Sequence, residues 1–450
     1  MITKLLGRVF KARMFKSAKP RIIALAAHGI RREQIGSCAL RVCDGLQEAG
    51  FSAFVVGGAV RDLILGRAPK DFDVATNAKP EEVRDIFRRS RIIGRRFRIV
   101  HVMCGRELVE VSTFRGPATE ADSNTQVEDE HGRLLRDNVW GDQAQDATRR
   151  DFTINALFYD PAKEQVWDYH GGVADLGHKR LRMIGEPVQR YREDPVRMLR
   201  AVRFSASCDL DIEASTRRPI QSLATLLNNV PSARLFDELL KLLLSGHAVD
   251  CIQRLRQEKL HQDLLPFLDA ILGQDSGERF VMQALKNTDQ RVRVGKTVSP
   301  AFLFATLTWH EVRSRWQAIQ ARGVPSIPAL HEAMDGVIQE QTKRIAIPRR
   351  FTSDMKDLWL MQQRFEQRSG QRPFRLLEHP RFRAGYDFLL LRCDSGELDP
   401  SLGEWWTAFQ EADTDARAAM LVTETKTPNK KRRRRRKPAA SAAAAIVAEG

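Results

Sequence analysis

Paired cysteines, long apolar runs and a leader-like start are all missing from this sequence of 450 residues. Its six cysteines are scattered and form no Cys-x-x-Cys pair, which argues against both a disulfide framework and a zinc site. No run of 18 apolar residues occurs, so no transmembrane helix is expected. Residues 1–19 are basic but contain no apolar stretch long enough for a cleaved signal peptide. These absences together fit a reducing, cytoplasmic compartment.

Acidic residues are also in deficit, since 57 Asp and Glu face 73 Lys and Arg and leave a net charge of +16. Nine basic residues and no acidic residue lie between Lys426 and Lys437, so much of this charge is local. This excess of positive charge points to a polyanionic partner. Nucleic acid is the leading candidate and an anionic membrane surface the second, while a tail that only promotes solubility is the alternative without a partner. Residues 2–16 also fit a short amphipathic helix on a membrane, although a flexible basic arm is the simpler interpretation.

The apolar pattern divides the chain into an α/β N-terminal third and a helical remainder. Strands are expected at 51–56, 71–75, 97–104 and 107–114, and helices at 33–49, at 59–65 and from Pro80. Residues 116–146 are polar and acid-rich and are expected to be a mobile loop. Helical periodicity marks 197–206, 235–244, 300–321, 327–345, 352–368 and 380–392. From about residue 423 the Lys/Arg-rich and then Ala/Ser-rich composition predicts disorder.

The most informative stretch runs Lys70-Asp71-Phe72-Asp73-Val74-Ala75-Thr76. Because side chains alternate along a strand, Asp71 and Asp73 share one face while Phe72 and Val74 point to the core. Carboxylates about 6–7 Å apart along a strand repel each other unless cations lie between them. Such a pair suits two Mg²⁺ ions in phosphoryl transfer. An isolated Asp-x-Asp more often marks a surface loop, so this interpretation depends on the surrounding residues.

Just upstream, the residues Val55-Val56-Gly57-Gly58-Ala59-Val60-Arg61-Asp62 predict a strand that ends at two glycines and a helix. Glycines let the backbone approach a phosphate, and a helix N-terminus favours the phosphate charge. A tight turn alone would also explain them. Beside the two carboxylates, however, the motif predicts a triphosphate site next to a metal site.

Two residues compete for the role of a third carboxylate. Glu110 lies in an apolar strand expected to neighbour 71–75, where a charge needs a partner or a metal, unless the strand is a surface edge. Asp151 lies in Arg149-Arg150-Asp151-Phe152-Thr153-Ile154-Asn155-Ala156. There the arginines can meet triphosphate oxygens, and Asp151 can bind metal or sugar, or cap a helix. The sequence does not decide between the two.

Four motifs, in this order, resemble those of the class II nucleotidyltransferases, the family of bacterial poly(A) polymerases and CCA-adding enzymes. They are 57–62, Asp71-x-Asp73, 149–156 and 193–204, and they span about residues 51–204. The resemblance implies an α+β protein with a small mixed β-sheet head and an all-helical neck, body and tail. We therefore expect a basic arm at 1–30, a catalytic head at 31–160, a nucleotide-selecting neck at 161–235, an RNA-binding body at 236–422 and a disordered basic tail at 423–450.

The resemblance also assigns roles to individual residues. Asp71 and Asp73 would be catalytic and would hold two Mg²⁺ ions. The two candidates for the third carboxylate join them on the reasoning above, Glu110 as a metal ligand and Asp151 as a catalytic residue. The ATP-binding set would comprise Gly57, Gly58, Arg61, Asp62, Arg150, Asn155, Asp194, Arg197, Arg200 and Arg203. Asp194 and Arg197 would face the base, although Asp194 before Pro195 also suits a helix N-cap.

One stretch separates the two branches of the family. Residues 92–101, Ile-Ile-Gly-Arg-Arg-Phe-Arg-Ile-Val-His, resemble the sequence that marks the poly(A) polymerases, as do 71–78, 191–198 and the basic tail. The expected activity is template-independent transfer of AMP from ATP to RNA 3′ ends, with release of pyrophosphate, in bacterial RNA polyadenylation and decay. A tRNA CCA-adding enzyme is the first alternative. A non-catalytic RNA-binding protein is the second, and the presence of all four carboxylates argues against it.

RNA is expected to lie along the basic helical body and tail, where phosphate contacts would be sequence-tolerant and salt-sensitive. The candidates are Lys343, Arg344, Arg349, Arg350, Arg381, Arg383, Lys430, Lys431, Arg432, Arg433, Arg434, Arg435, Arg436 and Lys437. Ordinary solvated helix faces are the alternative for the first six. RNA-decay proteins and a peripheral membrane contact are further partners that the sequence leaves open.

Overall fold

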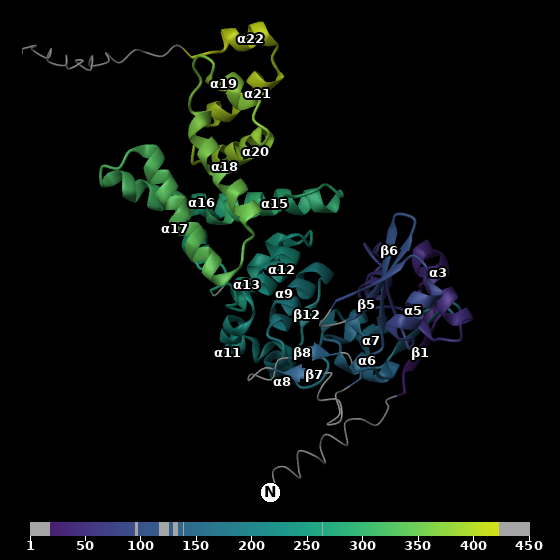
Figure 1. Ribbon diagram of the computed structural model, residues 1–450. Coiled ribbons are helices and arrows are strands. Elements are labelled where there is room, and N and C mark those ends of the chain that lie inside the picture. Colours follow the sequence, from purple (N-terminus) through teal and green to yellow (C-terminus); the bar gives the residue numbers. More distant parts are fainter. Residues whose placement is uncertain are drawn as a thin grey trace, which may run out of the picture.

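The computed structural model shows a mixed α/β head followed by helices that succeed one another away from it (Figure 1). It describes residues 19–94, 98–116, 126–128, 134–137, 139–262 and 264–422. The predictions made for residues 1–18, for Arg95–Phe97 and for the tail with Lys430–Lys437 lie outside this range. Within it, the predicted fold class is confirmed: a mixed-sheet head precedes an all-helical remainder.

An eight-stranded sheet forms the head, in the order β1-β10-β9-β2-β3-β6-β5-β4. Its neighbours pair antiparallel except β3 and β6, which pair in parallel. The strands are β1 (Arg21–Ala24), β2 (Ala53–Val56), β3 (Asp73–Thr76), β4 (Ser90–Ile93), β5 (Ile99–Cys104), β6 (Glu107–Thr113), β9 (Leu157–Asp160) and β10 (Gln165–Asp168). The strands predicted for 51–56, 71–75, 97–104 and 107–114 correspond to β2, β3, β5 and β6.

The two faces of this sheet are covered differently. Helices α3 (Ser37–Glu48) and α5 (Pro80–Ile86) pack on the face that carries Val55 and Val74 and belongs to the main core. The opposite face holds a small cluster that includes Phe54, Ala75 and Phe158. Because side chains alternate along β3, Asp73 shares this second face with Ala75. The predicted carboxylates therefore stand on the face that α3 and α5 leave uncovered.

Three predicted boundaries in the head change. Strand β1 pairs with β10, so residues 21–24, predicted to belong to the N-terminal arm, lie in the head sheet. Strand β10 and helix α7 (Gly172–Gly177) extend the head past residue 160. The stretch 116–146, predicted as a loop, contains a strand pair, β7 (Gln126–Glu128) and β8 (Leu134–Asp137), and the start of α6 (Gln143–Arg149). These strands are too short for an alternating pattern to reveal them.

The helical remainder matches the periodicity of the sequence. All six helices predicted after residue 190 are present, as α9 (Val196–Cys208), α12 (Ser232–Leu243), α16 (Pro300–Ala321), α17 (Ser326–Arg344), α18 (Arg349–Phe365) and α20 (Phe382–Asp394). Unpredicted helices lie between and after them, among them α8 (Pro187–Glu193), α13 (Ala248–Gln257), α15 (Asp275–Arg293) and α21 (Pro400–Glu411). The shorter elements are α2 (Leu25–His28), α4 (Gly58–Ile64), β11 (Arg180–Leu181), β12 (Asp211–Ile212), α10 (Ala214–Arg217), α11 (Ile220–Leu223), α14 (Leu268–Leu272), α19 (Arg372–Leu377) and α22 (Thr414–Ala419).

Helices α9, α12 and α13 lie next to the head, and α19, α21 and α22 lie at the far end of the molecule (Figure 1). The far end has an aromatic core of its own around Trp406 and Phe365, whose ring centroids are 5.0 Å apart. No helix in the described part of the chain combines the length and apolarity that a membrane span requires.

One disulfide joins Cys38 of α3 to Cys104 at the end of β5. The scattered cysteines predicted no disulfide, and for this pair the prediction is wrong. The two residues are 66 positions apart and meet because α3 packs across the sheet, so their spacing carries no signal. The other four cysteines are buried and free.

Candidate active site

The predicted carboxylates meet where β3 begins. Asp73 is the first residue of β3, and the parallel register places it opposite Glu110 of β6. The prediction that the strand of Glu110 neighbours the Asp71–Ala75 strand is therefore confirmed. Asp71 lies two residues before Asp73, and all three residues are exposed. Glu110 also approaches His101 of β5, whose Nε2 lies 3.3 Å from its Oε1.

Negative charge at this point is not fully compensated. Partial burial of the carboxyl group, followed by the charges of Asp71 and Glu110, raises the pKa of Asp73 to about 6, against the opposing effect of Arg150. Gathered carboxylates of this kind fit a hard divalent cation with oxygen ligands. Among the described residues, no three His, Cys, Asp or Glu side chains are already close enough together to hold a metal. An ion bound here would therefore draw the carboxylates together.

The turn between β2 and α4 requires glycine. Gly57 has φ 70° and ψ −120°, a conformation that side chains disfavour. A Cβ at this position would also lie 3.2 Å from Nη1 of Arg150 and 3.6 Å from the carbonyl oxygen of Asn155. Arg150 Nη1 donates to that same oxygen at 3.3 Å, and its guanidinium lies 5.1 Å from the ring of Phe158. The glycine turn and Arg150 are thus in direct contact, as a shared phosphate site would need.

A buried chain of hydrogen bonds connects α4, the segment after α6, and α9. Arg61 Nη1 donates to Asn155 Oδ1 at 2.8 Å, and Asn155 Nδ2 donates to Asp151 Oδ1 at 3.2 Å. Arg200 Nε donates to Asp151 Oδ2 at 2.7 Å. Arg61 also pairs with Asp62, at 2.7 Å. Four predicted ATP-binding residues are therefore joined through Asp151.

The two oxygens of Asp151 are already occupied by donors of the chain itself. Burial alone would raise the pKa of Asp151, but the charge of Arg200 and hydrogen bonds from Asn155, Arg200 and the Phe152 amide outweigh burial and lower the pKa to about 2. Glu110, by contrast, is exposed and lies in register with Asp73. The geometry favours Glu110 over Asp151 as the third metal ligand.

Half-buried arginines gather around Arg149, next to Arg150 in the chain. Burial and then the charges of Arg115, Arg190 and Arg197 lower the pKa of Arg149 to about 10. Arg190 holds this segment in place, since its Nη2 donates to the carbonyl oxygens of Arg149 and Arg150 at 2.8 and 2.7 Å. Arg190 and Arg197 share one carboxylate, that of Glu193. Cations that repel one another in a partly dry site favour a polyanion such as a triphosphate.

Three more guanidiniums surround the ring of Phe204 in α9. Those of Arg61, Arg200 and Arg203 lie 5.1, 5.2 and 4.3 Å from its centroid. Burial, with Arg200 next in effect, lowers the pKa of Arg203. Its Nε is buried and has no hydrogen-bond partner among the described residues. The ring therefore gathers the predicted Arg61, Arg200 and Arg203 into one positive surface.

Asp194 is the C-cap of α8 and not the N-cap of α9. Helix α9 begins at Val196 with Pro195 as its N-cap, and Asp194 Oδ2 instead accepts a bond from Arg234 Nη2 of α12 at 2.7 Å. The other oxygen, Oδ1, is buried without a partner in the described part of the chain. Asp194 thus offers one unused acceptor beside Arg197.

Arg190, Arg115 and Arg234 were not predicted. Each lies outside the motifs, and Arg234 is 40 residues from Asp194, so neither pattern nor spacing could reveal the contact.

The predicted RNA contacts in the body divide into two groups. Arg381 pairs with Asp354 and Asp357, and Arg383 Nε lies 3.0 Å from Asp387. Arg349 and Arg350, at the start of α18, are exposed and have no ion-pair partner among the described residues. Lys343 and Arg344 are exposed at the end of α17. The eight basic residues of 430–437 lie outside the described residues.

Three family profiles match successive parts of the chain. Residues 53–182 match the Poly A polymerase head domain, 209–272 the probable RNA and SrmB-binding site of polymerase A, and 322–439 the polymerase A arginine-rich C-terminus. The first of these contains the carboxylates, the glycine turn and Arg149–Ala156.

Whole-length relatives agree with these matches. Poly(A) polymerase I of Salmonella typhimurium is 46% identical over 409 residues, which cover 89% of this chain and 88% of that protein. Poly(A) polymerase I of Haemophilus influenzae is 43% identical over 423 residues, covering 91% and 94%. The CCA-adding enzyme of Lactobacillus helveticus is 36% identical over 229 residues, covering 51% and 55%.

Solved structures share the fold. The CCA-adding enzyme of Bacillus stearothermophilus in complex with CTP aligns with a TM-score of 0.55 at 24% identity, over 82% of this chain and 80% of that one. The Thermotoga maritima CCA-adding enzyme complexed with tRNA aligns with a TM-score of 0.57 at 18% identity, over 90% and 91%.

Proposed function

The chain belongs to the family of bacterial poly(A) polymerases, and from that premise we propose how its residues perform the reaction. It is a template-independent poly(A) polymerase, which adds adenylates to RNA. The observation that carries the mechanism is that Asp73 and Glu110 lie side by side in register at the start of β3. The positive charge of Arg150 acts on the carboxyl group of Asp73 and opposes the rise in its pKa. Carboxylates on one side and guanidiniums on the other suit a metal-bound triphosphate.

Asp71, Asp73 and Glu110 would hold Mg²⁺, because Asp73 lies in register with Glu110, and burial and then the charges of Asp71 and Glu110 raise the pKa of Asp73. Bound there, two Mg²⁺ ions would lower the pKa of the RNA 3′-OH and neutralise charge on the phosphates. Asp151 we assign to positioning, since its two oxygens hold Arg200 and Asn155. The carboxylates of the chain would thus have two roles: Asp71, Asp73 and Glu110 would hold the ions, and Asp151 would keep Arg200 and Asn155 in place.

Arg149, Arg150 and the Gly57–Gly58 turn would bind the triphosphate. Arg190 fixes the backbone of both arginines, so their guanidiniums are held in place before ATP arrives. Donors that are already oriented stabilise the charge of departing pyrophosphate without reorganisation. Arg115 and Arg197 add to the same positive field.

Asp194 and Arg197 would read the base. Adenine presents an amino donor beside a ring-nitrogen acceptor, which suits the free Oδ1 of Asp194 and a guanidinium donor. Uracil and guanine present the opposite pattern and would leave these buried groups unpaired. Cytosine presents the same pattern as adenine. Discrimination against CTP would then use the larger size of adenine, which a fixed Asp194 can detect, and Arg234 holds Asp194 in place.

The helical body would bind RNA, with the phosphates of the primer on exposed cations such as Arg349 and Arg350. The match of 209–272 to a probable RNA and SrmB-binding site extends this surface toward the neck and supports an RNA-associated protein partner. We place the enzyme in the bacterial cytoplasm, where RNA 3′ ends and ATP occur together, and assign it to RNA polyadenylation and decay. The residues 423–450 would add a basic RNA-binding tail to this surface.

A primer-extension assay with Mg²⁺, a generic RNA oligonucleotide and each nucleoside triphosphate separately tests the assignment. We expect a long ladder with ATP alone. Addition confined to a tRNA without its 3′ end, requiring CTP and stopping after three nucleotides, would instead assign the chain to the CCA-adding branch. The double variant Asp71→Asn/Asp73→Asn should lose incorporation; if it did not, the metal assignment would be wrong.

A further inference from the structure

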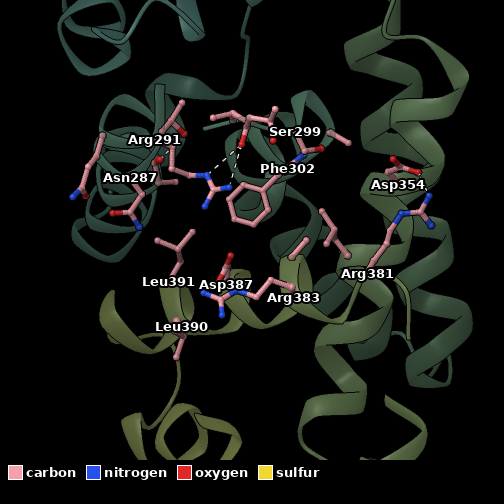
Figure 2. A pocket seen from close by; sticks show the side chains of 18 of the residues that line it. Asn287, Arg291, Ser299, Phe302, Asp354, Arg381, Arg383, Asp387, Leu390 and Leu391 are labelled. Carbon is pink, nitrogen blue, oxygen red and sulfur yellow. Dashed lines mark hydrogen bonds and ion pairs between the residues drawn. The ribbon is translucent and has the colours of Figure 1, made fainter. Parts of the chain in front are cut away.

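A cavity of about 570 Å³ opens in the helical body, between α15, α16, α18 and α20 (Figure 2). Asn287 and Arg291 line it from α15, Phe302 from α16, and Asp387 and Leu391 from α20. Its size is in the range, roughly 300–1,000 Å³, of sites for ligands as large as a nucleotide. The helices that line the cavity come much later in the sequence than β3 and β6, which carry the carboxylates. Helix α15 lies outside the three segments that match the family profiles.

Two of the arginines that line this cavity are paired with carboxylates. Arg381 is held by Asp354, and Arg383 lies 3.0 Å from Asp387. Asp394 and Arg291 also line the cavity and form no ion pair with any described residue. Donors and acceptors of both signs suit a group with hydrogen-bonding edges, such as a base, better than they suit a phosphate.

The wall of the cavity includes a fixed aromatic ring. Phe302 is half-buried and meets Phe388 edge to face, with ring centroids 6.0 Å apart. Phe388 is fully buried and anchored in turn by Trp309 and Phe280. Figure 2 shows Phe302 and Arg291 directed into the cavity, with Leu390 and Leu391 on the side opposite. Aromatic and guanidinium planes are the surfaces on which unstacked RNA bases lie.

Cations without carboxylate partners follow the end of α15. Lys286, Arg291, Arg293 and Lys296 form no ion pair with any described residue, and Arg291 and Arg293 are held only by the carbonyl oxygens of Thr297 and Gly246. Asp289, on the same helix, is buried, and its two carboxylate oxygens accept hydrogen bonds from the amides of Ala248 and Val249. A second hollow, lined by Lys286 and Arg293, shares Gln290 with the cavity. Asp250 of α13 is the exposed carboxylate of this second hollow, so cations outnumber exposed carboxylates between α13 and the cavity.

We propose that this cavity is an upstream RNA subsite: one unstacked base of the RNA enters it against Phe302, while the flanking phosphates lie on the cations at the end of α15. This inference rests on the proposed function, since it takes the RNA to be the primer whose 3′ end is in the active site. The site would bind RNA that is long enough to span both regions and would ignore shorter primers. The site would increase affinity for the growing tail and would take no part in the chemical step.

Primers of increasing length, each with one 2-aminopurine at a varied position, test the subsite by fluorescence and by AMP incorporation. Phe302→Leu keeps an apolar side chain beside Phe388 and should weaken binding of long RNA about tenfold by loss of stacking. Arg291→Gln/Arg293→Gln should weaken it and make the slope of log affinity against log salt shallower by about 1.4, at about 0.7 for each phosphate contact on a single strand. Short primers and the KM for ATP should not change in either variant.

Arg106→Gln/Arg322→Gln is the matched control, because both arginines are exposed and without ion-pair partners in the described part of the chain. Unchanged binding of long RNA by the α15 and Phe302 variants, with unchanged melting temperature, would overturn the proposal and leave the cavity to a protein partner. Equal losses for short and long RNA would overturn it as well. If the unaltered enzyme incorporated no AMP, the proposed function itself would fail, which is a separate result.

Discussion

Glu110 and Asp151 are acidic residues in the same site, but their surroundings suit them to different tasks. Glu110→Gln should lower Mn²⁺ affinity by more than about 100-fold, because even side chains that only hold a metal ligand in place are worth about 10–100-fold in metal affinity. Electron paramagnetic resonance of Mn²⁺ measures this directly. Glu107→Gln, an exposed position on the same strand, is the control and should bind Mn²⁺ normally.

Asp151→Asn should have the opposite profile. It leaves the half-buried guanidinium of Arg200 without its carboxylate partner, which lowers the stability by up to about 3 kcal/mol. We expect a lower melting temperature and weaker ATP binding while Mn²⁺ binding is retained. If Asp151→Asn abolished Mn²⁺ binding in a protein that remained folded, Asp151 rather than Glu110 would be the ligand.

Arg234 acts on the nucleotide only through Asp194, which it holds in place by a hydrogen bond. Arg234→Ala frees Asp194 to rotate, so the acceptor that meets the base loses its fixed position. We expect the ratio of kcat/KM for ATP to that for CTP to fall about tenfold, a difference of about 1.4 kcal/mol. Arg234→Lys, which keeps the charge, should restore part of the ratio. Equal slowing with both nucleotides would show that Arg234 supports the fold and has no role in selection.

At the scale of elements, the turn from β2 into α4 can be tested with two glycines of similar φ. Gly57→Ala places a Cβ against Arg150 in a backbone conformation that costs about 1–3 kcal/mol. Gly66→Ala, at φ 69°, meets nothing within 4 Å. Both variants should melt at a lower temperature, but only Gly57→Ala should lose ATP binding by calorimetry. Normal ATP binding by Gly57→Ala would remove the turn from the phosphate site.

Elements and motifs that lie within one short stretch could be predicted from the sequence. The alternation around Asp73, the glycines after Val56 and the periodicity of α16 each depend on neighbouring residues alone. Even the approach of Glu110 to Asp73 follows from adjacent strands. What could not be predicted depends on packing between distant elements. The Arg234–Asp194 contact needs α12 beside α9, and the disulfide needs α3 across the sheet.

At the scale of the whole molecule, the head supplies carboxylates and α8, α9 and α12 supply most of the arginines and the base-reading groups. The nucleotide site therefore exists only because the helices beside the head pack on it. Cation–aromatic contacts of Arg61, from α4, with Phe204 of α9 are part of that attachment. The remaining helices extend away from the head (Figure 1), which gives RNA a long surface to follow.

Removing residues 423–450 should change RNA affinity without changing stability. The last packed contacts precede the cut, since Trp405 Nε1 donates to the carbonyl of Met420 and the amide of Val422 to that of Arg368. The melting temperature should therefore be unaltered. The deleted part contains nine basic residues between Lys426 and Lys437, so the slope of log affinity against log salt should become shallower by up to about 6. A tail of equal length in which those nine residues are Ser and Gly should behave like the deletion, because the effect belongs to charge and not to length. An unchanged slope in both variants would mean that the tail does not contact the RNA.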